Sequence, residues 1–151
     1  MNLKYKIRLK KFAEDILQQR METAQQAMLN AQDAANSEDK SSAGDKYETA
    51  RAMGQLDREM NAKQFEEAKR ELAQLQNLYI QEASSVVIPG SFVKTNKGDF
   101  FISSGLGIHT VDGKKIGFLS TKSPLAIPLL GKAAGETFQF QGQPWKVESL
   151  V

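Results

Sequence analysis

Residues 41–49, SSAGDKYET, separate two long polar stretches of sequence. Ala, Gln, Glu, Lys, Arg and Met predominate on both sides of this segment, and no proline precedes residue 89. These residues are good helix formers. We therefore predict one helix from about Leu3 to Ala35, a polar turn over 36–44 and a second helix from about Asp45 to Gln81. Two helices of similar length joined by a short turn form an antiparallel hairpin.

Apolar residues recur at helical spacing in both stretches. The first ten residues also alternate as a strand would, but their continuity with the helix that follows favours a helix. In the second stretch the steps of three and four residues are typical of a coiled coil. The predicted seam residues are Leu9, Phe12, Ile16, Ala27, Ala31 and Ala34 in the first helix and Phe65, Ala68, Leu72, Leu75 and Tyr79 in the second, with a less regular stripe through Tyr47, Ala50, Met53, Leu56 and Met60.

The composition changes near residues 82–85, where proline, glycine, valine, isoleucine and phenylalanine become frequent. This change predicts strands and turns. Strands are expected over 86–88, 91–95, 100–103, 116–120, 138–140 and 145–150, turns at 96–99 and 112–113, and a short helix over 125–130. The predicted fold class is thus α+β, with a coiled-coil domain over 1–82 and a small β-rich domain over 85–151.

Composition excludes several classes of protein. The chain contains no cysteine, which removes disulfides, thiolate zinc sites and cysteine nucleophiles, and which fits a reducing cytoplasm. Its formal net charge of +2 is too small to indicate nucleic-acid binding by itself. No segment resembles a signal peptide or a membrane span. We therefore expect a cytoplasmic protein without a membrane partner.

Asp45 and Glu48 lie three residues apart where the second helix is predicted to begin, in an acidic tip region near 36–49. This pattern is close to a capping box, and acids in a first turn also favour the positive end of the helix dipole. Taken alone, the spacing favours capping. Carboxylate oxygens are also the ligands that Mg²⁺ prefers, often with only one or two protein groups. Both roles are compatible.

Other polar residues receive simpler interpretations. Five cations, Lys4, Lys6, Arg8, Lys10 and Lys11, cluster near the N-terminus, and a solvated helix surface is their default interpretation, with nucleic-acid steering as the alternative. His109 is the only histidine, so a structural zinc site is not expected. No segment supplies a self-contained catalytic constellation or a site for a small-molecule substrate.

Two separated segments resemble the bacterial Gre transcript cleavage factors. Residues 44–50, GDKYETA, are similar to the family's tip signature of Gly-Asp, two variable residues and Glu-Asn-Ala. Residues 123–136, SPLAIPLLGKAAGE, are similar to the Ser-Pro-Leu-Gly…Leu-Leu-Gly-Lys…Gly-Asp segment of its C-terminal domain. The order and separation of the motifs match across nearly the whole chain. Thr49, Ala126 and Pro128 depart from the usual pattern, which indicates a divergent branch.

This resemblance implies a fold and a function. The fold would be an antiparallel coiled coil followed by an FKBP-like domain. The C-terminal domain would dock on RNA polymerase, and the coiled coil would enter the secondary channel. Asp45 and Glu48 would then help to hold Mg²⁺ while the polymerase itself cleaves the nascent RNA near its 3′ end. Gly44 at the tip and Ser123, Pro124 and Leu125 in the C-terminal domain would serve partner binding.

Two other functions remain open at this point. A divergent tip is compatible with a regulator that occupies the same channel without promoting cleavage. A peptidyl-prolyl isomerase or chaperone would use an FKBP-like pocket, but such a pocket needs clustered aromatic residues, and most of those in the second half are needed for its core. The chain would itself be an enzyme only if it were the isomerase.

Overall fold

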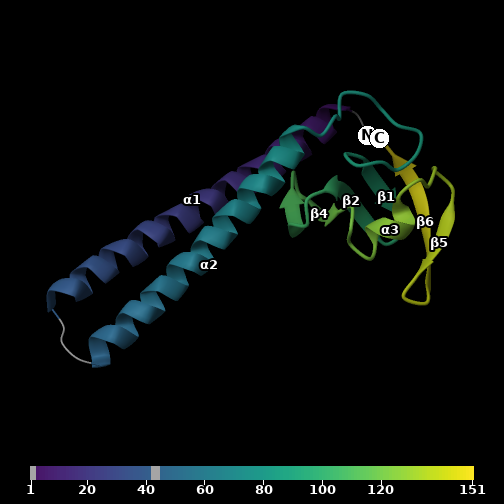
Figure 1. The fold of residues 1–151 in the computed structure, drawn as a ribbon. Coiled ribbons are helices and arrows are strands. Elements are labelled where there is room, and N and C mark those ends of the chain that lie inside the picture. The colour runs from purple at the N-terminus through teal and green to yellow at the C-terminus, as the bar shows by residue number, and fades with distance from the viewer. Residues whose placement is uncertain (1–2, 42–44) are drawn as a thin grey trace. The chain divides into compact units, whose positions relative to one another are not determined.

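The structure is a computed structural model that describes the backbone of residues 3–41 and 45–151 and the side chains of residues 3–34 and 48–151. Two long helices precede a six-stranded sheet with one short helix (Figure 1). This arrangement confirms the α+β class. The elements are α1 (Leu3–Ser41), α2 (Asp45–Gln76), β1 (Phe92–Thr95), β2 (Gly98–Ser103), β3 (Gly107–Val111), β4 (Lys114–Ser120), α3 (Ala126–Leu129), β5 (Thr137–Phe140) and β6 (Gln143–Leu150).

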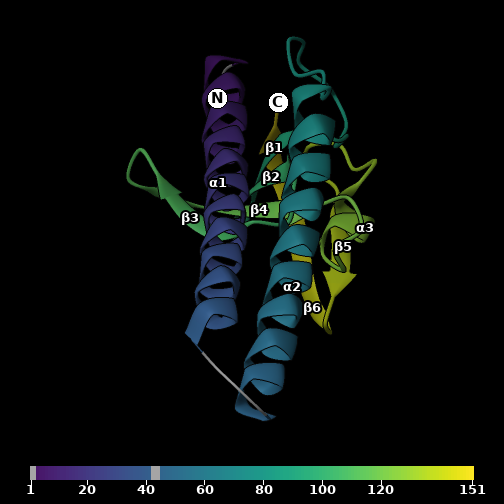
Figure 2. The ribbon, with the colours of Figure 1, turned by 60° about the vertical axis from the view of Figure 1, so that its left-hand side comes forward.

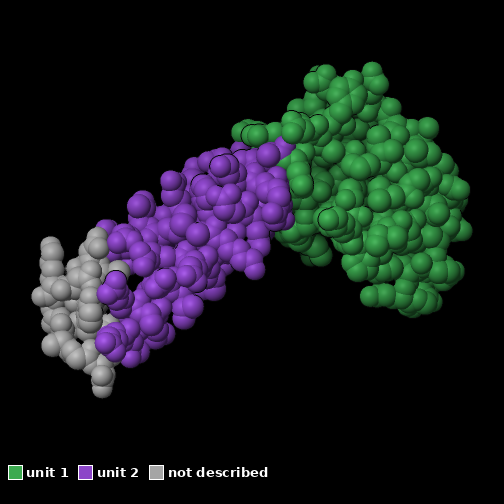
Figure 3. Space-filling view, in the orientation of Figure 1, with its two compact units in different colours: residues 1–14, 74–151 green, residues 15–73 purple. Residues whose placement is uncertain are grey.

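The chain divides into two compact units, shown in green and purple in Figure 3. Unit 1 comprises residues 1–14 and 74–151, and unit 2 comprises residues 15–73. The start of α1 therefore belongs with the sheet, which the composition change near residues 82–85 does not reveal. Among the helices of the described residues, none has the length and hydrophobicity that a membrane crossing requires.

In unit 2, α1 and α2 lie side by side and run in opposite directions (Figures 1 and 2). The fully buried side chains of this pair are small or medium in size: Leu17, Ala24, Ala68 and Leu72. Nearer the start of α2, the half-buried positions include Ala50, Gly54, Arg58, Asn61 and Phe65, which step by four, four, three and four residues, and Ala62 beside them is half-buried as well. Apart from Phe65, the α2 side of this part of the seam is therefore lined by small and polar residues.

The predicted stripe through Met53, Leu56 and Met60 is wrong, because all three side chains are exposed. A seam that continues from Ala68 and Phe65 at helical spacing reaches residues 61, 58 and 54, and Met53, Leu56 and Met60 lie one or two positions away from these. Ala34 and Tyr79, also predicted in the seam, are exposed as well.

The helix limits differ from the predicted ones for identifiable reasons. α1 continues to Ser41, so the predicted turn is helical over 36–41, where neither glycine nor proline interrupts the chain. α2 ends at Gln76, five residues early. The chain leaves the helix there because Ile80 is buried against Gly90. The contact is so close that a Cβ atom added to Gly90 would lie 2.9 Å from the Ile80 Cγ2 atom.

The sheet of unit 1 has the strand order β3-β4-β2-β1-β6-β5. Its neighbours are antiparallel except for β2 and β4, which are parallel. Five of the six strands were predicted at nearly these positions. β3 was not predicted, and the predicted strand over 86–88 is reduced to one bridge between Val86 and Ala133.

The start of α1 packs on one face of the sheet. The Tyr5 ring meets Phe92 edge-on with centroids 5.0 Å apart, and the Phe12 ring stacks on Phe118 at 5.6 Å. His109 contacts the same Phe12 and Phe118 rings, and its Nε2 atom lies 2.8 Å from the Leu106 carbonyl oxygen. The sole histidine is thus part of an aromatic cluster.

The opposite face of the sheet carries a second buried cluster around α3. Its buried members are Val87, Val93, Ile102, Ala126, Leu129, Phe138 and Val147. On this face the Phe100 ring lies over Gly117 of β4. A Cβ atom added to Gly117 would lie 2.7 Å from the Phe100 ring. The glycine therefore gives the ring its space. Trp145 contacts Phe100, Phe138 and Phe140 at centroid distances of 5.9 Å.

Candidate functional site

The predicted acidic pair lies at the start of α2. The helix begins at Asp45, and Glu48 lies in its first turn with an exposed side chain. Gly44 and the side chain of Asp45 lie outside the described residues, so the pairing of the two carboxylates stays a prediction. A first helical turn has free N–H groups and a positive dipole end, and both stabilise negative charge. This position therefore favours acidic residues.

Within the described residues, no group of three or more histidine, aspartate or glutamate side chains is arranged to hold a metal ion. A Mg²⁺ ion commonly takes one or two carboxylates from one molecule and the rest of its ligands from water or from a second molecule. Asp45 and Glu48 are the residues that the sequence predicts for such a shared site, and this role stays a prediction.

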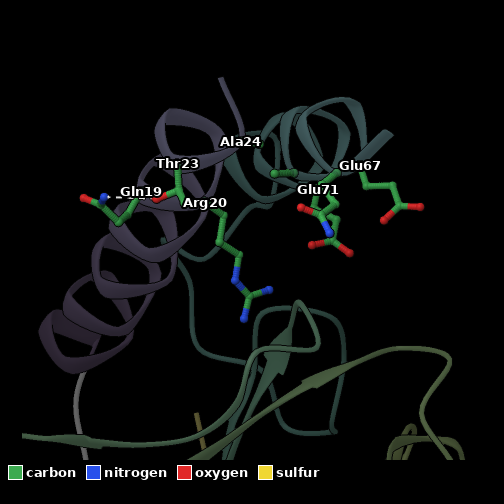
Figure 4. Close-up of a pocket in the computed structure, with 8 residues that line it drawn as sticks. Gln19, Arg20, Thr23, Ala24, Glu67 and Glu71 are labelled. Carbon is green, nitrogen blue, oxygen red and sulfur yellow. Dashed lines mark hydrogen bonds between the residues drawn. The ribbon is translucent and has the colours of Figure 1, made fainter. Parts of the chain in front are cut away.

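Among the grooves along the helical pair of unit 2, two are lined by residues of both helices. The first has a volume of about 350 Å³, and its charged lining residues are Arg20 of α1 and Glu67 and Glu71 of α2. Figure 4 shows Arg20 extending from α1 into the space beside α2, with the Gln19 amide donating to the Thr23 hydroxyl next to it. The groove therefore presents both signs of charge.

The second groove, of about 640 Å³, lies between the two helices nearer the acidic turn in sequence. Met28 and Leu29 line it from α1, and Arg58 and Ala62 line it from α2. The Arg58 guanidinium donates to the side-chain oxygen of Gln32 across the pair. This polar link replaces the apolar contact that a regular coiled coil would place there.

The predicted docking segment, Ser123 to Leu125, forms the turn that begins α3. The Ser123 hydroxyl accepts a hydrogen bond from the Ala126 N–H at 3.3 Å, and the Ser123 carbonyl accepts one from the Ile127 N–H at 3.2 Å. Leu125 packs against the buried cluster, whereas Pro124 is exposed. The segment thus has a structural part and a part that a partner can reach.

Ile127 belongs to the same exposed surface, although the sequence interpretation did not single it out. Its side chain is 62% exposed, while Ala126 and Leu129 on either side are fully buried. Within an apolar run, an isoleucine reads as a core residue. Helical spacing could have predicted this exposure, because residues 126 and 129 share the buried face and residue 127 must point away from it.

The N-terminal cations are not all solvated, contrary to their default interpretation. Lys6 is only 1% exposed, and its Nζ atom donates to the Glu82 carbonyl oxygen at 3.2 Å. Burial lowers the pKa of its ammonium group below the ordinary value of 10.5. Lys10 donates to the carbonyl oxygens of Gln76 and Leu78 at 3.2 and 3.1 Å. It therefore caps the end of α2.

Arg8 pairs with Asp112 at 2.7 Å. Three of the five N-terminal cations thus hold unit 1 together, which leaves fewer of them to steer nucleic acid.

The chain matches no model of a known protein family, and no curated protein is significantly similar to it in sequence.

Proposed function

We propose that this protein is a transcription elongation factor that binds bacterial RNA polymerase in the cytoplasm and stimulates cleavage of backtracked RNA. The observation that carries the proposal is the placement of the acidic motif. Two antiparallel helices flank it, α2 begins at Asp45, and the Glu48 side chain is exposed. The similarity of residues 44–50 and 123–136 to the Gre family supplies the identity of the partner. By the same similarity, the helical pair is a coiled coil and unit 1 contains an FKBP-like domain.

The chemistry follows from the two carboxylates. Phosphodiester hydrolysis benefits from two metal ions, one that activates water and one that stabilises the leaving oxygen. Asp45 and Glu48 would contribute ligands to a Mg²⁺ ion whose remaining ligands come from the polymerase active centre. The helical pair delivers them through the secondary channel. The nuclease is the polymerase, and this chain supplies the acids.

Docking would use the start of α3 in unit 1. Pro124 and Ile127 expose apolar surface there, and Ser123 and Leu125 hold the turn in place from within. Because an apolar residue that is exposed in the free protein gains most when a partner covers it, Ile127 is the residue of this surface that should contribute most to affinity.

The decisive experiment mixes the protein with a backtracked elongation complex and Mg²⁺ and measures the release of short 3′ RNA fragments. Asp45→Asn and Glu48→Gln should each lower the cleavage rate by about 10- to 100-fold, as expected when groups that tune a metal site are lost. Asp57→Asn and Glu59→Gln are matched controls, since both alter exposed acids elsewhere on α2. Cleavage that is unchanged in the Asp45 and Glu48 variants would refute the metal-site role.

A regulator that occupies the channel without cleavage is the second candidate, favoured by Thr49 at a position where the Gre signature has Asn. It predicts that the protein binds the polymerase and inhibits initiation, while the elongation complex releases no RNA fragment. Ile127→Asp should weaken polymerase binding under both functions. It therefore tests the docking surface independently of the cleavage chemistry.

A further inference from the structure

The two edges of the unit 1 sheet differ in character. β3 and β5 are the edge strands, and each is followed by a two-residue turn to its neighbour. The side chains that β5 exposes, Thr137 and Gln139, are polar. On β3 the corresponding position carries Ile108, which is 74% exposed, the highest value among the large apolar side chains described. An edge strand with an apolar side chain is a template for another strand.

Hairpin geometry determines which backbone groups of β3 are available. Asp112 and Gly113 form the turn with φ angles of 52° and 77°, and Val111 pairs with Lys114. In such a two-residue hairpin the two residues that flank the turn exchange hydrogen bonds. Along the ladder, hydrogen-bonded pairs then alternate with pairs that are not hydrogen-bonded to each other. The N–H and C=O groups of Ile108 and Thr110 therefore point away from β4, toward the side of β3 that pairs with no other strand.

The side chains beside this edge are predominantly basic. Lys115 pairs with Thr110 and so lies on the same face of the sheet as Thr110 and Ile108. Lys114 lies over the Tyr5 ring at the same end of the hairpin. The carboxylate of Asp112 is already paired with Arg8. A strand added to β3 would lie about 10 Å from β4, a span that a lysine and a glutamate side chain bridge together.

We propose that β3 binds an extended acidic segment of a partner protein, which adds to the sheet as a seventh strand. Main-chain hydrogen bonds to Ile108 and Thr110 hold the segment, an apolar side chain covers Ile108, and an acidic side chain two residues away meets Lys115. This is the strand-addition mode of peptide recognition, in which the backbone supplies affinity and alternate side chains supply specificity. A second copy of this chain fits less well, because its own β3 strand (Gly107–Val111) contains no acidic residue to meet Lys115.

A synthetic eight-residue peptide, valine-threonine-glutamate-threonine repeated twice and labelled with a fluorophore, tests the proposal on the full-length protein, because its valine and glutamate side chains lie two residues apart on one face of the strand. Fluorescence anisotropy at low salt should show binding. The matched valine–lysine peptide and a valine–glutamate peptide that is N-methylated at every second amide should bind at least about tenfold more weakly. In NMR spectra the amide signals of Ile108 and Thr110 should shift and become protected from hydrogen exchange.

Three variants locate the site. Ile108→Asp should weaken peptide binding about tenfold or more, and Lys115→Glu about threefold to fivefold, with a reversed preference for the valine–lysine peptide. Thr137→Asp is the matched control, because Thr137 has the same place relative to its turn on the other edge strand. It should bind the peptide as the unaltered protein does.

Equal binding of the acidic and basic peptides would overturn the proposal, as would a loss in Thr137→Asp equal to that in Ile108→Asp. Self-association that Ile108→Asp abolishes, without any peptide binding, would assign the edge to a second copy and also overturn it. The assay contains no polymerase and no RNA, so its outcome does not depend on the cleavage function.

Discussion

Residues 3–14 of α1 and the remainder of the same helix are held in different ways. The first part buries Lys6, Leu9 and Ala13 and places two aromatic rings on the sheet. The second part pairs with α2 through Leu17 and Ala24, and beyond Ala24 none of its described side chains is fully buried. Large side chains fix the first part, whereas the second depends more on intrinsic helix propensity.

The difference has an energetic basis. Burying a large apolar side chain stabilises a protein by about 1.5 to 3 kcal/mol, and alanine offers much less surface to bury. In unit 2 the large side chains Leu29, Met53, Leu56 and Met60 are instead exposed. Unit 1 should therefore have the greater resistance to unfolding, and the two units should respond to different substitutions.

The largest effect is expected for Phe118→Ala in unit 1. Phe118 is buried and contacts Phe12, Phe101 and His109, so its loss should lower the free energy of unfolding by about 3 to 5 kcal/mol. Ala68→Gly in the seam of unit 2 should cost only about 1 kcal/mol. Trp145 fluorescence reports on unit 1 and far-UV circular dichroism mainly on the helices. If both probes give one coincident transition in every variant, the units unfold together and the comparison fails.

Two glycine substitutions should have opposite signs. Gly117→Ala forces a methyl group against the Phe100 ring in unit 1 and should destabilise the protein by about 1 to 3 kcal/mol. Gly54→Ala in α2 meets no atom within 4 Å and should stabilise the protein by up to about 1 kcal/mol. Denaturant titration of both variants measures the two shifts. A stabilising Gly117→Ala would show that Phe100 can move aside.

The smallest effect concerns the pH dependence that Lys6 creates. Its pKa is lower in the folded chain than in the unfolded one, so as the pH rises toward the ordinary lysine value of 10.5 the unfolded chain binds more protons. Lys6 therefore makes the free energy of unfolding rise with pH in this range. Lys6→Met should remove that rise, seen in denaturant titrations across the range.

Lys4→Met, an exposed lysine one half-turn away, controls for the loss of a positive charge. Tyr5 makes the free energy of unfolding fall with pH instead. Burial, and after it the nearby Asp112 and Asp99 carboxylates, raise the pKa of Tyr5 above 10.0. Its contribution to stability is lost only as the pH rises above that value. A slope in Lys6→Met equal to that of the unaltered protein would contradict the role of Lys6.

Local sequence signals were sufficient where local physics decides the structure. The long helices follow from composition, and most strands from turns such as Asn96-Lys97 and Asp112-Gly113. Tertiary contacts decide the rest. The end of α2 depends on Lys10 and on Ile80 against Gly90, which are distant in sequence. β3 was missed because an exposed edge strand buries little and lacks a regular alternation of burial.

The candidate site was predictable to a similar extent. The Ser123 turn and the start of α2 at Asp45 lie where the motifs placed them. The burial of Lys6 and the exposure of Ile127 were not predicted, because each depends on what packs against the helix rather than on the residue type. Lysine is ordinarily a surface residue and isoleucine a core residue.

The pairing of the first helical turns with the last strands has a consequence for folding during synthesis. Tyr5 and Phe12 leave the ribosome before the strands do, yet Tyr5 packs on Phe92, whose backbone exchanges hydrogen bonds with Val151. Contacts so distant in sequence form late, whereas those within residues 15–73 join segments already synthesised. The helical pair can therefore assemble on the nascent chain while the N-terminal aromatic residues still await the strands that will cover them.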